Sequence, residues 1–320
     1  MRKPILFLVA ICALTIAHEA AAQDKWPSRP IKLIVPYAPG GNTDTVSRLT
    51  ADFAQRELGG AHIVVENRTG AGGIVGTESV AKATADGYTL CMCSIGAITI
   101  APATEQLRYD PLNDLAPISL VNTNPLILLV HPSVKANSVQ ELVALARAEP
   151  NRFTYSSAGI GSLTYFSAEL FKAKTGIQIT HVPYRGGSPA TAAVAAGDVH
   201  LTFANMSDAL GLLESGKVRA LGVTTTMRAP AAPTVPTVAE QGIAGYSTEL
   251  WNGLFAPRGT PQPIIDRLSV IAATMAKDMT IRKRMTELGS VAVANSPDEF
   301  ARMLREETAQ WATLVKELAH

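Results

Sequence analysis

Eight short apolar runs recur along the chain, each separated from the next by sequence with a helical pattern. The runs are IKLIVPY (31–37), AHIVVENR (61–68), YTLCMCSI (88–95), LILLVHP (126–132), RFTYSSA (152–158), IQITHVPY (177–184), VHLTFAN (199–205) and RALGVTT (219–225). Such alternation predicts an α/β fold with largely parallel sheets. Because the runs are almost continuously apolar rather than alternating, we expect helices to cover both faces of the strands.

Capping residues indicate where the helices begin. We expect helices that start at Asp44, Ser138, Ser188-Pro189, Thr237, Thr260-Pro261 and Ser296-Pro297. The first should run through Leu58, and glycines should follow three of the helices, at Gly59, Gly197 and Gly242.

Two changes in composition indicate that the chain crosses between two domains. One lies at 117–125, and the other at 229–236, where three prolines in eight residues predict a stiff, extended spacer. We therefore assign residues 23–122 and 246–320 to one domain and 123–245 to the other. Two crossings of this kind form a hinge.

The first residues have the pattern of a secretory signal peptide. Arg2 and Lys3 precede the apolar run 5–17, which is short for a membrane span, and 20–22 is a run of three alanines. We expect residues 1–22 to be a signal peptide that directs the chain to the periplasm. Cys12 follows Ile11 rather than a small residue, which disfavours a lipid anchor. No later segment supplies about 20 uninterrupted apolar residues, so we expect a soluble mature chain.

Charge and composition exclude several classes of protein. The 320 residues include 28 Lys plus Arg and 27 Asp plus Glu, a formal net charge of +1, which disfavours nucleic-acid binding. An apolar fraction of 47% is too high for a disordered chain. Cys91 and Cys93 are two residues apart in a predicted strand, where closing so small a ring is unfavourable, so we expect buried free thiols.

Searches for catalytic or metal-binding motifs find no good candidate. None of the six histidines pairs at a metal-ligand spacing, and no nucleophile elbow is present, so we expect no metal, no cofactor and no catalytic residue. The segment 211–217 has the spacing of a phosphate loop, but it ends a predicted helix and Val218 replaces the Ser or Thr. The segment 70–76 resembles a dinucleotide loop with a misplaced third glycine, and a turn for close helix packing explains it better.

Loops rich in Gly, Ser and Asn follow several strands. They are 37–44 and 94–96 in one predicted domain and 156–162 and 184–188 in the other. Ligands of open α/β sheets bind at such carboxyl ends of strands, and glycine-rich loops before helices expose N–H groups to anions. Each loop alone can be only a tight turn, but together they favour a cleft that binds a small carboxylate.

Five segments carry a resemblance to a known family. They are 30–44 (PIKLIVPYAPGGNTD), 65–73 (VENRTGAGG), 86–90 (DGYTL), 181–186 (HVPYRG) and 236–240 (PTVAE) before Trp251. Because these segments occur together in this order, the chain resembles the periplasmic receptors of tripartite tricarboxylate transporters, also called Bug-type receptors. The resemblance covers essentially the whole mature sequence. The resemblance implies a two-domain, type II periplasmic-binding-protein fold that closes over a small organic acid and passes it to membrane permease subunits.

The resemblance also implies a set of ligand-binding residues. The backbone amides of 37–42 hold a carboxylate and the other loops clamp the rest of the ligand. The candidates are Tyr37, Pro39, Gly40, Gly41, Asn42, Asp44, Ser94, Ile95, Gly96, Ser156, Ser157, Ala158, Gly159, Gly161, Ser162, Thr164, Tyr184, Asn205 and Asp208.

Several of these residues have a competing structural role. Tyr37 and Tyr184 either form walls of the pocket or pack in the core. Arg185 either pairs with a second carboxylate or is a solvated surface residue. Asp44 fits a helix cap better than a ligand contact.

Three functions follow from these expectations. The first is a non-catalytic receptor for carboxylate uptake, which we expect to be a monomer because its hinge must open and close. The second is a ligand-sensing periplasmic subunit of a signalling system, which uses the same closure. The third, with the least support, is a secreted enzyme acting on a small acid.

Overall fold

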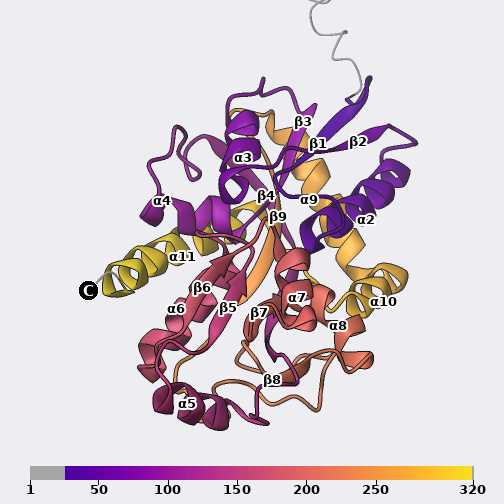
Figure 1. Cartoon of the computed structure of the whole chain (residues 1–320). Helices are drawn as coiled ribbons and strands as arrows, with labels where there is room; N and C mark the ends of the chain where they lie inside the picture. The colour runs from indigo at the N-terminus through magenta and orange to yellow at the C-terminus, as the bar shows by residue number, and fades with distance from the viewer. Residues whose placement is uncertain (1–25, 319–320) are drawn as a thin grey trace, which may run out of the picture.

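The computed structural model describes residues 26–318, and the predicted signal peptide, residues 1–22, lies outside them. Ten strands form one curled sheet with the order β2-β1-β3-β9-β4-β7-β5-β6, and β8 and β10 both pair with β4 (Figure 1). Helices pack around this sheet. The predicted α/β class is therefore confirmed.

All the predicted strands are present, and most lie within a few residues of the expected bounds, but β4 begins 11 residues before the predicted run 126–132. The strands are β1 (Ile31–Val35), β2 (Ile63–Asn67), β3 (Thr89–Ser94), β4 (Leu115–Val130), β5 (Thr154–Ser157), β6 (Thr180–Pro183), β7 (Leu201–Asn205), β8 (Arg219–Val223), β9 (Glu249–Pro257) and β10 (Val291–Ala292).

The helices begin near most of the expected caps. They are α2 (Asn42–Glu57), α3 (Ile74–Ala81), α4 (Ala101–Thr104), α5 (Val139–Ala148), α6 (Leu163–Thr175), α7 (Gly187–Ala196), α8 (Met206–Glu214), α9 (Gln262–Lys277), α10 (Met279–Glu287) and α11 (Pro297–Leu318), with short turns η1 (Ala71–Gly73) and η2 (Gly96–Ile100). The helix predicted at Thr237 is wrong. Thr237 and Glu240 exchange the expected capping hydrogen bonds, but Gly242 follows too soon, and the segment forms turns only.

The sheet is parallel within each half and antiparallel in its middle. β1 pairs in parallel with β2 and β3, and β5 pairs in parallel with β6 and β7. In contrast, β9 is antiparallel to β3 and β4, and β4 is antiparallel to β7 and β8. The prediction of largely parallel sheets therefore fails at the centre, because β4 and β9 carry the chain in opposite directions between the halves.

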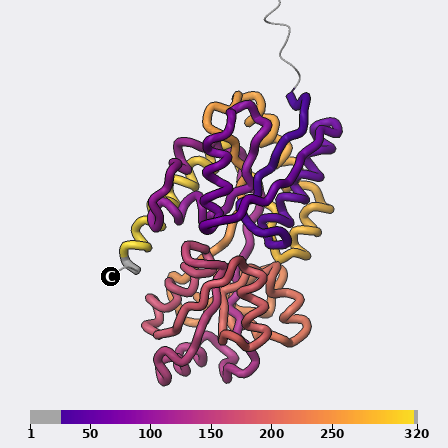
Figure 2. The backbone as a smooth tube through the Cα atoms, turned by 45° about the horizontal axis from the view of Figure 1, so that its top comes forward, coloured from indigo at the N-terminus to yellow at the C-terminus, as the bar shows by residue number. Residues whose placement is uncertain are grey.

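Two lobes result from this arrangement. The first lobe surrounds β1, β2 and β3 and also contains the C-terminal helices, and the second lobe surrounds β5 to β8 (Figure 2). The partner of β4 changes from β9 to β7 between Pro125 and Leu126. We propose that these lobes are the two domains predicted from the sequence, 23–122 with 246–320 and 123–245.

The proline-rich segment 229–236 is not the extended spacer that its composition predicts. It forms turns, and Ala229 is buried in the same apolar cluster as Ile127 and Val223 of the second lobe. Its alanines and Val235 are apolar, so packing them against the sheet removes more apolar surface from water than an extended spacer does.

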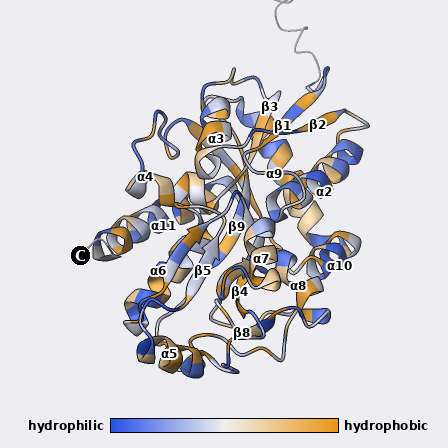
Figure 3. Cartoon of the chain, in the orientation of Figure 1, coloured by the Kyte–Doolittle hydropathy of each residue, from blue (hydrophilic) through white to orange (hydrophobic). Residues whose placement is uncertain are grey.

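Apolar clusters fill both lobes. One cluster packs β1, α2, α9 and α10 of the first lobe together. Another runs through both lobes, from Ile34 and Phe300 in the first lobe to α5 and α6 in the second. Several outer helices carry both hydrophilic and hydrophobic residues, as expected for helices with one solvated face (Figure 3).

The expectation of free thiols at Cys91 and Cys93 is wrong, because the structure joins them in a disulfide. Their Cα atoms are 5.4 Å apart, which is less than twice the usual strand rise of about 3.3 Å and lies within the range that disulfides span. Side chains two residues apart in a strand point to the same face. Cys91 and Cys93 therefore share one buried face of β3, which brings their sulfur atoms together.

Gly76 lies where α3 comes close to the backbone that follows β1 and β2. A Cβ atom at this position would lie 2.5 Å from the carbonyl oxygen of Arg68 and 2.9 Å from Cα of Pro36. Both neighbours are backbone atoms that have little room to move. This close approach of α3 to β1 supports the interpretation of the segment as a packing turn.

We expect Gly76→Ala to lower the free energy of unfolding by about 1–3 kcal/mol because of this overlap. Gly211→Ala, in the exposed part of α8 where no atom lies within 4 Å of the added Cβ, is the control. The free energy of unfolding of the control should rise by about 0.5–1 kcal/mol, because alanine has a higher helix propensity than glycine. Urea unfolding measures both, and equal stabilities of the two variants would contradict the packing argument.

Candidate functional site

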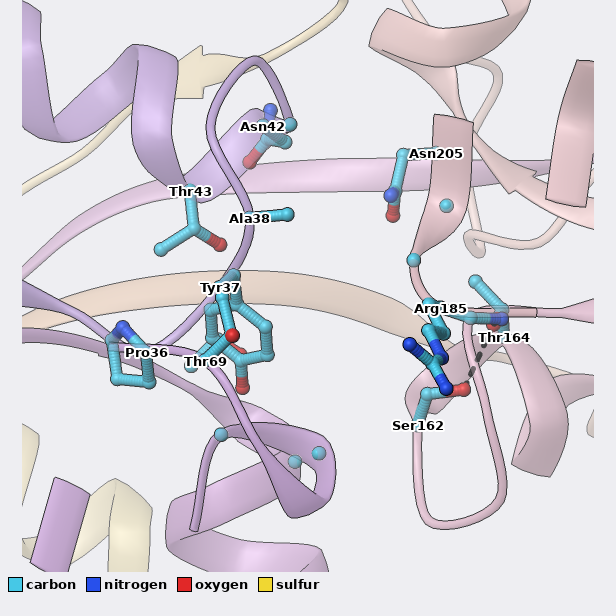
Figure 4. Close-up of a pocket in the computed structure, with 18 of the residues that line it drawn as sticks. Pro36, Tyr37, Ala38, Asn42, Thr43, Thr69, Ser162, Thr164, Arg185 and Asn205 are labelled. Atoms are coloured by element: carbon cyan, nitrogen blue, oxygen red, sulfur yellow. Dashed lines mark hydrogen bonds between the residues drawn. The ribbon is translucent and has the colours of Figure 1, made fainter. Parts of the chain in front are cut away.

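A cleft of about 710 Å³ lies between the lobes and is lined by loops from both. Side chains of the first lobe, including Tyr37 and Thr43, face Ser162, Thr164, Arg185 and Asn205 of the second lobe across it (Figure 4). Four helices, α2, α6, α7 and α8, begin beside the cleft. Their N-termini carry partial positive charge, so together they favour an anion in the cleft.

The loop after β1 forms the wall of the first lobe. Gly41 is the N-cap of α2 and has extended backbone angles, φ −76° and ψ 172°. Thr45 donates the first intrahelical hydrogen bond, to the carbonyl oxygen of Gly41 at 3.0 Å. The N–H groups that precede Thr45 in the helix have no intrahelical acceptor. They can therefore bind an oxyanion without a cationic side chain.

Asp44 does not cap α2, contrary to the prediction, because the helix begins two residues earlier. Its carboxylate instead accepts hydrogen bonds from the N–H of Gly40 at 2.9 Å, from Arg48 at 3.0 Å and from Asn67 at 2.9 Å. Burial by itself raises the pKa of Asp44, but these hydrogen bonds outweigh burial and hold the pKa below its usual value. Asp44 thus fixes the shape of the loop from behind.

Tyr37 lines the cleft, and its hydroxyl accepts a hydrogen bond from Ser94 at 2.7 Å. Burial raises the pKa of Tyr37 to about 12, so the phenol is neutral at physiological pH. A Cβ atom on Gly73 would lie 2.7 Å from the phenol oxygen. The glycine therefore makes room for the ring, and Tyr37 is a wall of the pocket rather than a residue of the interior.

Hydroxyl groups hold the second-lobe loop between β5 and α6 in place. Ser162 caps α6 by accepting from the N–H of Tyr165 and donates to the carbonyl oxygen of Gly159 at 2.6 Å. Thr164 accepts from the N–H of Ala158 at 2.8 Å. Both side chains line the cleft, although these bonds already occupy part of their capacity.

The structure brings most of the sequence candidates to the cleft but not all. The candidates that line it are Tyr37, Pro39, Gly41, Asn42, Ser94, Ile95, Gly96, Ala158, Ser162, Thr164, Tyr184, Asn205 and Asp208. Those outside the lining are Gly40, Asp44, Ser156, Ser157, Gly159 and Gly161. Two of the latter are fully buried behind the loop, where Ser156 bonds to the carbonyl oxygen of Ala190 and Ser157 to the ring of His181.

Sequence reasoning missed part of the lining. Thr69 and the glycine-rich turn 70–73 form a face of the cleft that the sequence does not predict. Arg185, for which the sequence leaves a ligand contact and a surface position open, also lines the cleft. The sequence of the turn by itself favours a packing role, because its match to a dinucleotide loop is poor. Its position after β2, beside the loop that follows β1, is the signal that indicates a second role.

A buried network of amide and hydroxyl side chains lies behind the cleft. Asn252 of β9 accepts from Thr43 at 2.7 Å and donates to Asn42 and Asn122, both at 2.9 Å. Asn124 of β4 donates to Ser290 and accepts from the N–H of Met206, the first residue of α8, at 3.1 Å. The network joins the start of α2 in one lobe to the start of α8 in the other through both crossing strands.

Glu307 of α11 connects the same region to the C-terminal helix. Its carboxylate accepts from Thr99 in η2 at 2.9 Å and from Trp251 in β9 at 2.8 Å. Burial raises the pKa of Glu307 to about 7, and the negative charge of Glu249 also raises it. The two hydrogen bonds act in the opposite direction and lower the pKa.

Within residues 26–318 no three His, Cys, Asp or Glu side chains are grouped as a metal ion requires. The segment 211–217 closes α8, as the sequence indicates, rather than opening a helix as a phosphate loop does.

Comparisons with known proteins point to one family. The model of a family described as the tripartite tricarboxylate transporter family receptor matches residues 46–320. The protein BugT of Bordetella pertussis is 34% identical over 319 residues, which cover 97% of each chain. Among solved structures, R. palustris Rpa4515 with adipate has a TM-score of 0.88 at 36% identity, covering 92% of this chain and 98% of that one. MatC (Rpa3494) from Rhodopseudomonas palustris with bound malate has a TM-score of 0.84 at 33% identity, covering 91% and 100%.

We expect Asn252→Leu to lower the free energy of unfolding by about 2–4 kcal/mol, because it leaves buried polar groups of Thr43, Asn42 and Asn122 without this partner. Asn113→Leu, at an exposed turn, should lower it by less than about 1 kcal/mol. Chemical denaturation distinguishes the two. If Asn252→Leu lowers the free energy of unfolding no more than Asn113→Leu does, the network is not needed for stability.

The raised pKa of Glu307 predicts a pH-dependent stability. The folded protein holds this proton more tightly than the unfolded chain does, so wild-type stability should fall as pH rises from about 4.5 to about 7. Glu307→Gln removes this titration. The free energy of unfolding of the variant, relative to wild type, should therefore increase by about 1–3 kcal/mol from pH 5 to pH 8. Melting curves at both pH values test this, with Glu306→Gln on the exposed side of α11 as control. A gain that does not change with pH would refute the assignment.

Proposed function

Because the chain belongs to the tripartite tricarboxylate transporter receptor family, we propose that it is a periplasmic receptor for a small organic carboxylate. It captures this solute in the cleft between its lobes and delivers it to the membrane permease subunits of a tripartite tricarboxylate-type transporter. The matched family is one of receptors rather than enzymes. Relatives that carry adipate and malate support a carboxylate as the solute.

One observation carries the proposal. The start of α2 presents backbone N–H groups to the cleft, and the described residues of the first lobe that line it include no charged side chain. A carboxylate that accepts hydrogen bonds from these amides is stabilised by the helix dipole and by close backbone approach at Gly41. Residues 37–42 are thus the proposed binding loop, and the candidates of the second lobe close over the rest of the ligand.

Two features support a periplasmic location. The predicted signal peptide directs export, and disulfides such as Cys91–Cys93 persist in the periplasm but are rare in the cytosol. None of the helices between residues 26 and 318 has the length and apolar character of a membrane span. We propose that the receptor works as a monomer, since the ligand needs both lobes of one chain and closure brings both to it.

Gly41→Val tests the binding loop. The backbone angles of Gly41 suit any residue, and only the carbonyl oxygen of Ala38, at 3.7 Å, lies near the added Cβ. The variant should therefore fold with a melting temperature within a few degrees of wild type. Its side chain covers the amides, so we expect binding to weaken about 100-fold or more.

The measurement is native mass spectrometry of purified protein, followed by calorimetric titration with mono-, di- and tricarboxylates. Gly211→Ala, at an exposed position of α8 outside the lining, should retain wild-type affinity. Unchanged affinity in Gly41→Val would exclude the amide loop as the binding site.

A further inference from the structure

The cleft contains a negative charge where an anion is expected to bind. Among the described residues of its lining, two have charged side chains, Arg185 and Asp208, and both belong to the second lobe. Asp208 lies in the first turn of α8. A carboxylate at this position repels the carboxylate of any ligand that reaches it, so its presence requires an explanation.

Neutral donors hold the Asp208 carboxylate in place. Its Oδ1 accepts from the hydroxyl of Ser188 at 2.7 Å, and its Oδ2 accepts from the side-chain amide of Asn205 at 3.1 Å. Within residues 26–318 it forms no ion pair with Arg185 or any other cation. Burial raises the pKa of Asp208, although these two hydrogen bonds oppose the shift.

The neighbouring helix leaves space for this carboxylate. A Cβ atom on Gly187, the first residue of α7, would lie 2.5 Å from Oδ2 of Asp208. A carboxylate accepts about four hydrogen bonds, and two are supplied by the protein. Acceptor capacity therefore remains on a group that lines the cleft, and a ligand can fill it only with a hydrogen-bond donor.

We propose that Asp208 is a specificity-determining residue that accepts a hydrogen bond from a hydroxyl or ammonium group of the ligand. The cleft then favours hydroxy or amino carboxylic acids over unsubstituted acids of the same chain length. This inference rests on the proposed function, since it assumes that the ligand's carboxylate lies in the same cleft. A hydrogen bond to a charged acceptor corresponds to a preference of about 10- to 100-fold.

Calorimetric titration with matched acids tests the inference. Each set shares one chain length of three to six carbons and differs at C2, which carries hydrogen, hydroxyl or ammonium, as in succinate, malate and aspartate. Wild type should bind at least one substituted acid about 10- to 100-fold more tightly than its parent. Comparison of the hydroxyl and ammonium members identifies the donor.

Asp208→Asn is the principal variant, because it keeps the shape of the side chain and removes its charge. We expect the preference to fall to about threefold or less, mainly through tighter binding of the unsubstituted acid as the repulsion is lost. Asp208→Leu, which removes all hydrogen bonding, should also lose the preference. Asp198→Asn, at an exposed position outside the lining, should keep it.

Three results would overturn the inference. Equal binding of substituted and parent acids by wild type would exclude a donor-accepting role while leaving the proposed receptor function intact. An unchanged preference in both Asp208 variants would assign the selectivity to other residues. If none of these acids binds to wild type, the inference is wrong, and the proposed function is wrong as well if the broader series of mono-, di- and tricarboxylates also fails to bind.

Discussion

The buried amide network at the crossing of β4 and β9 is the constraint on which the cleft depends. Asn122, Asn124 and Asn252 are fully buried, and buried amides are tolerated only when their hydrogen bonds are made. Their partners are the first residues of α2 and α8, so satisfying the network also fixes the two helix starts that face the ligand space. The three asparagines of β4 and β9 thus hold the walls of the cleft in position, although they do not line it themselves.

The proposed anion site needs no cationic side chain from the described first-lobe residues that line the cleft. The N-termini of four helices supply the positive potential, and glycines allow the backbone to approach closely. Side chains near the cleft mostly serve the loops: Asp44 binds the N–H of Gly40, and Ser162 binds the carbonyl oxygen of Gly159. Arg185 and Asp208 are the charged exceptions among the described lining residues, and both belong to the second lobe, where we propose that the selectivity lies.

Much of this could be predicted from the sequence, for identifiable reasons. Apolar runs and capping residues are local signals, so the strands and the helix starts at Ser138 and Pro297 lie close to where they were expected. The loops at 37–42 and 94–96 were found because glycine and serine at strand ends mark ligand loops. The same local reasoning failed for Cys91 and Cys93, because a regular strand spacing was assumed where the chain is locally shorter.

The sequence by itself determined the α/β class, the resemblance to the receptor family and the loops from which the cleft is built, because these depend on residues near one another in the chain. Only the tertiary structure decided which side chains face the ligand space. Ser157 turns inward to His181, whereas the glycines at 70–73 face the cleft. Such choices depend on contacts between distant segments, as when Asn42 meets Asn252, 210 positions away. No local pattern encodes that meeting, since it follows from the order in which the strands pair.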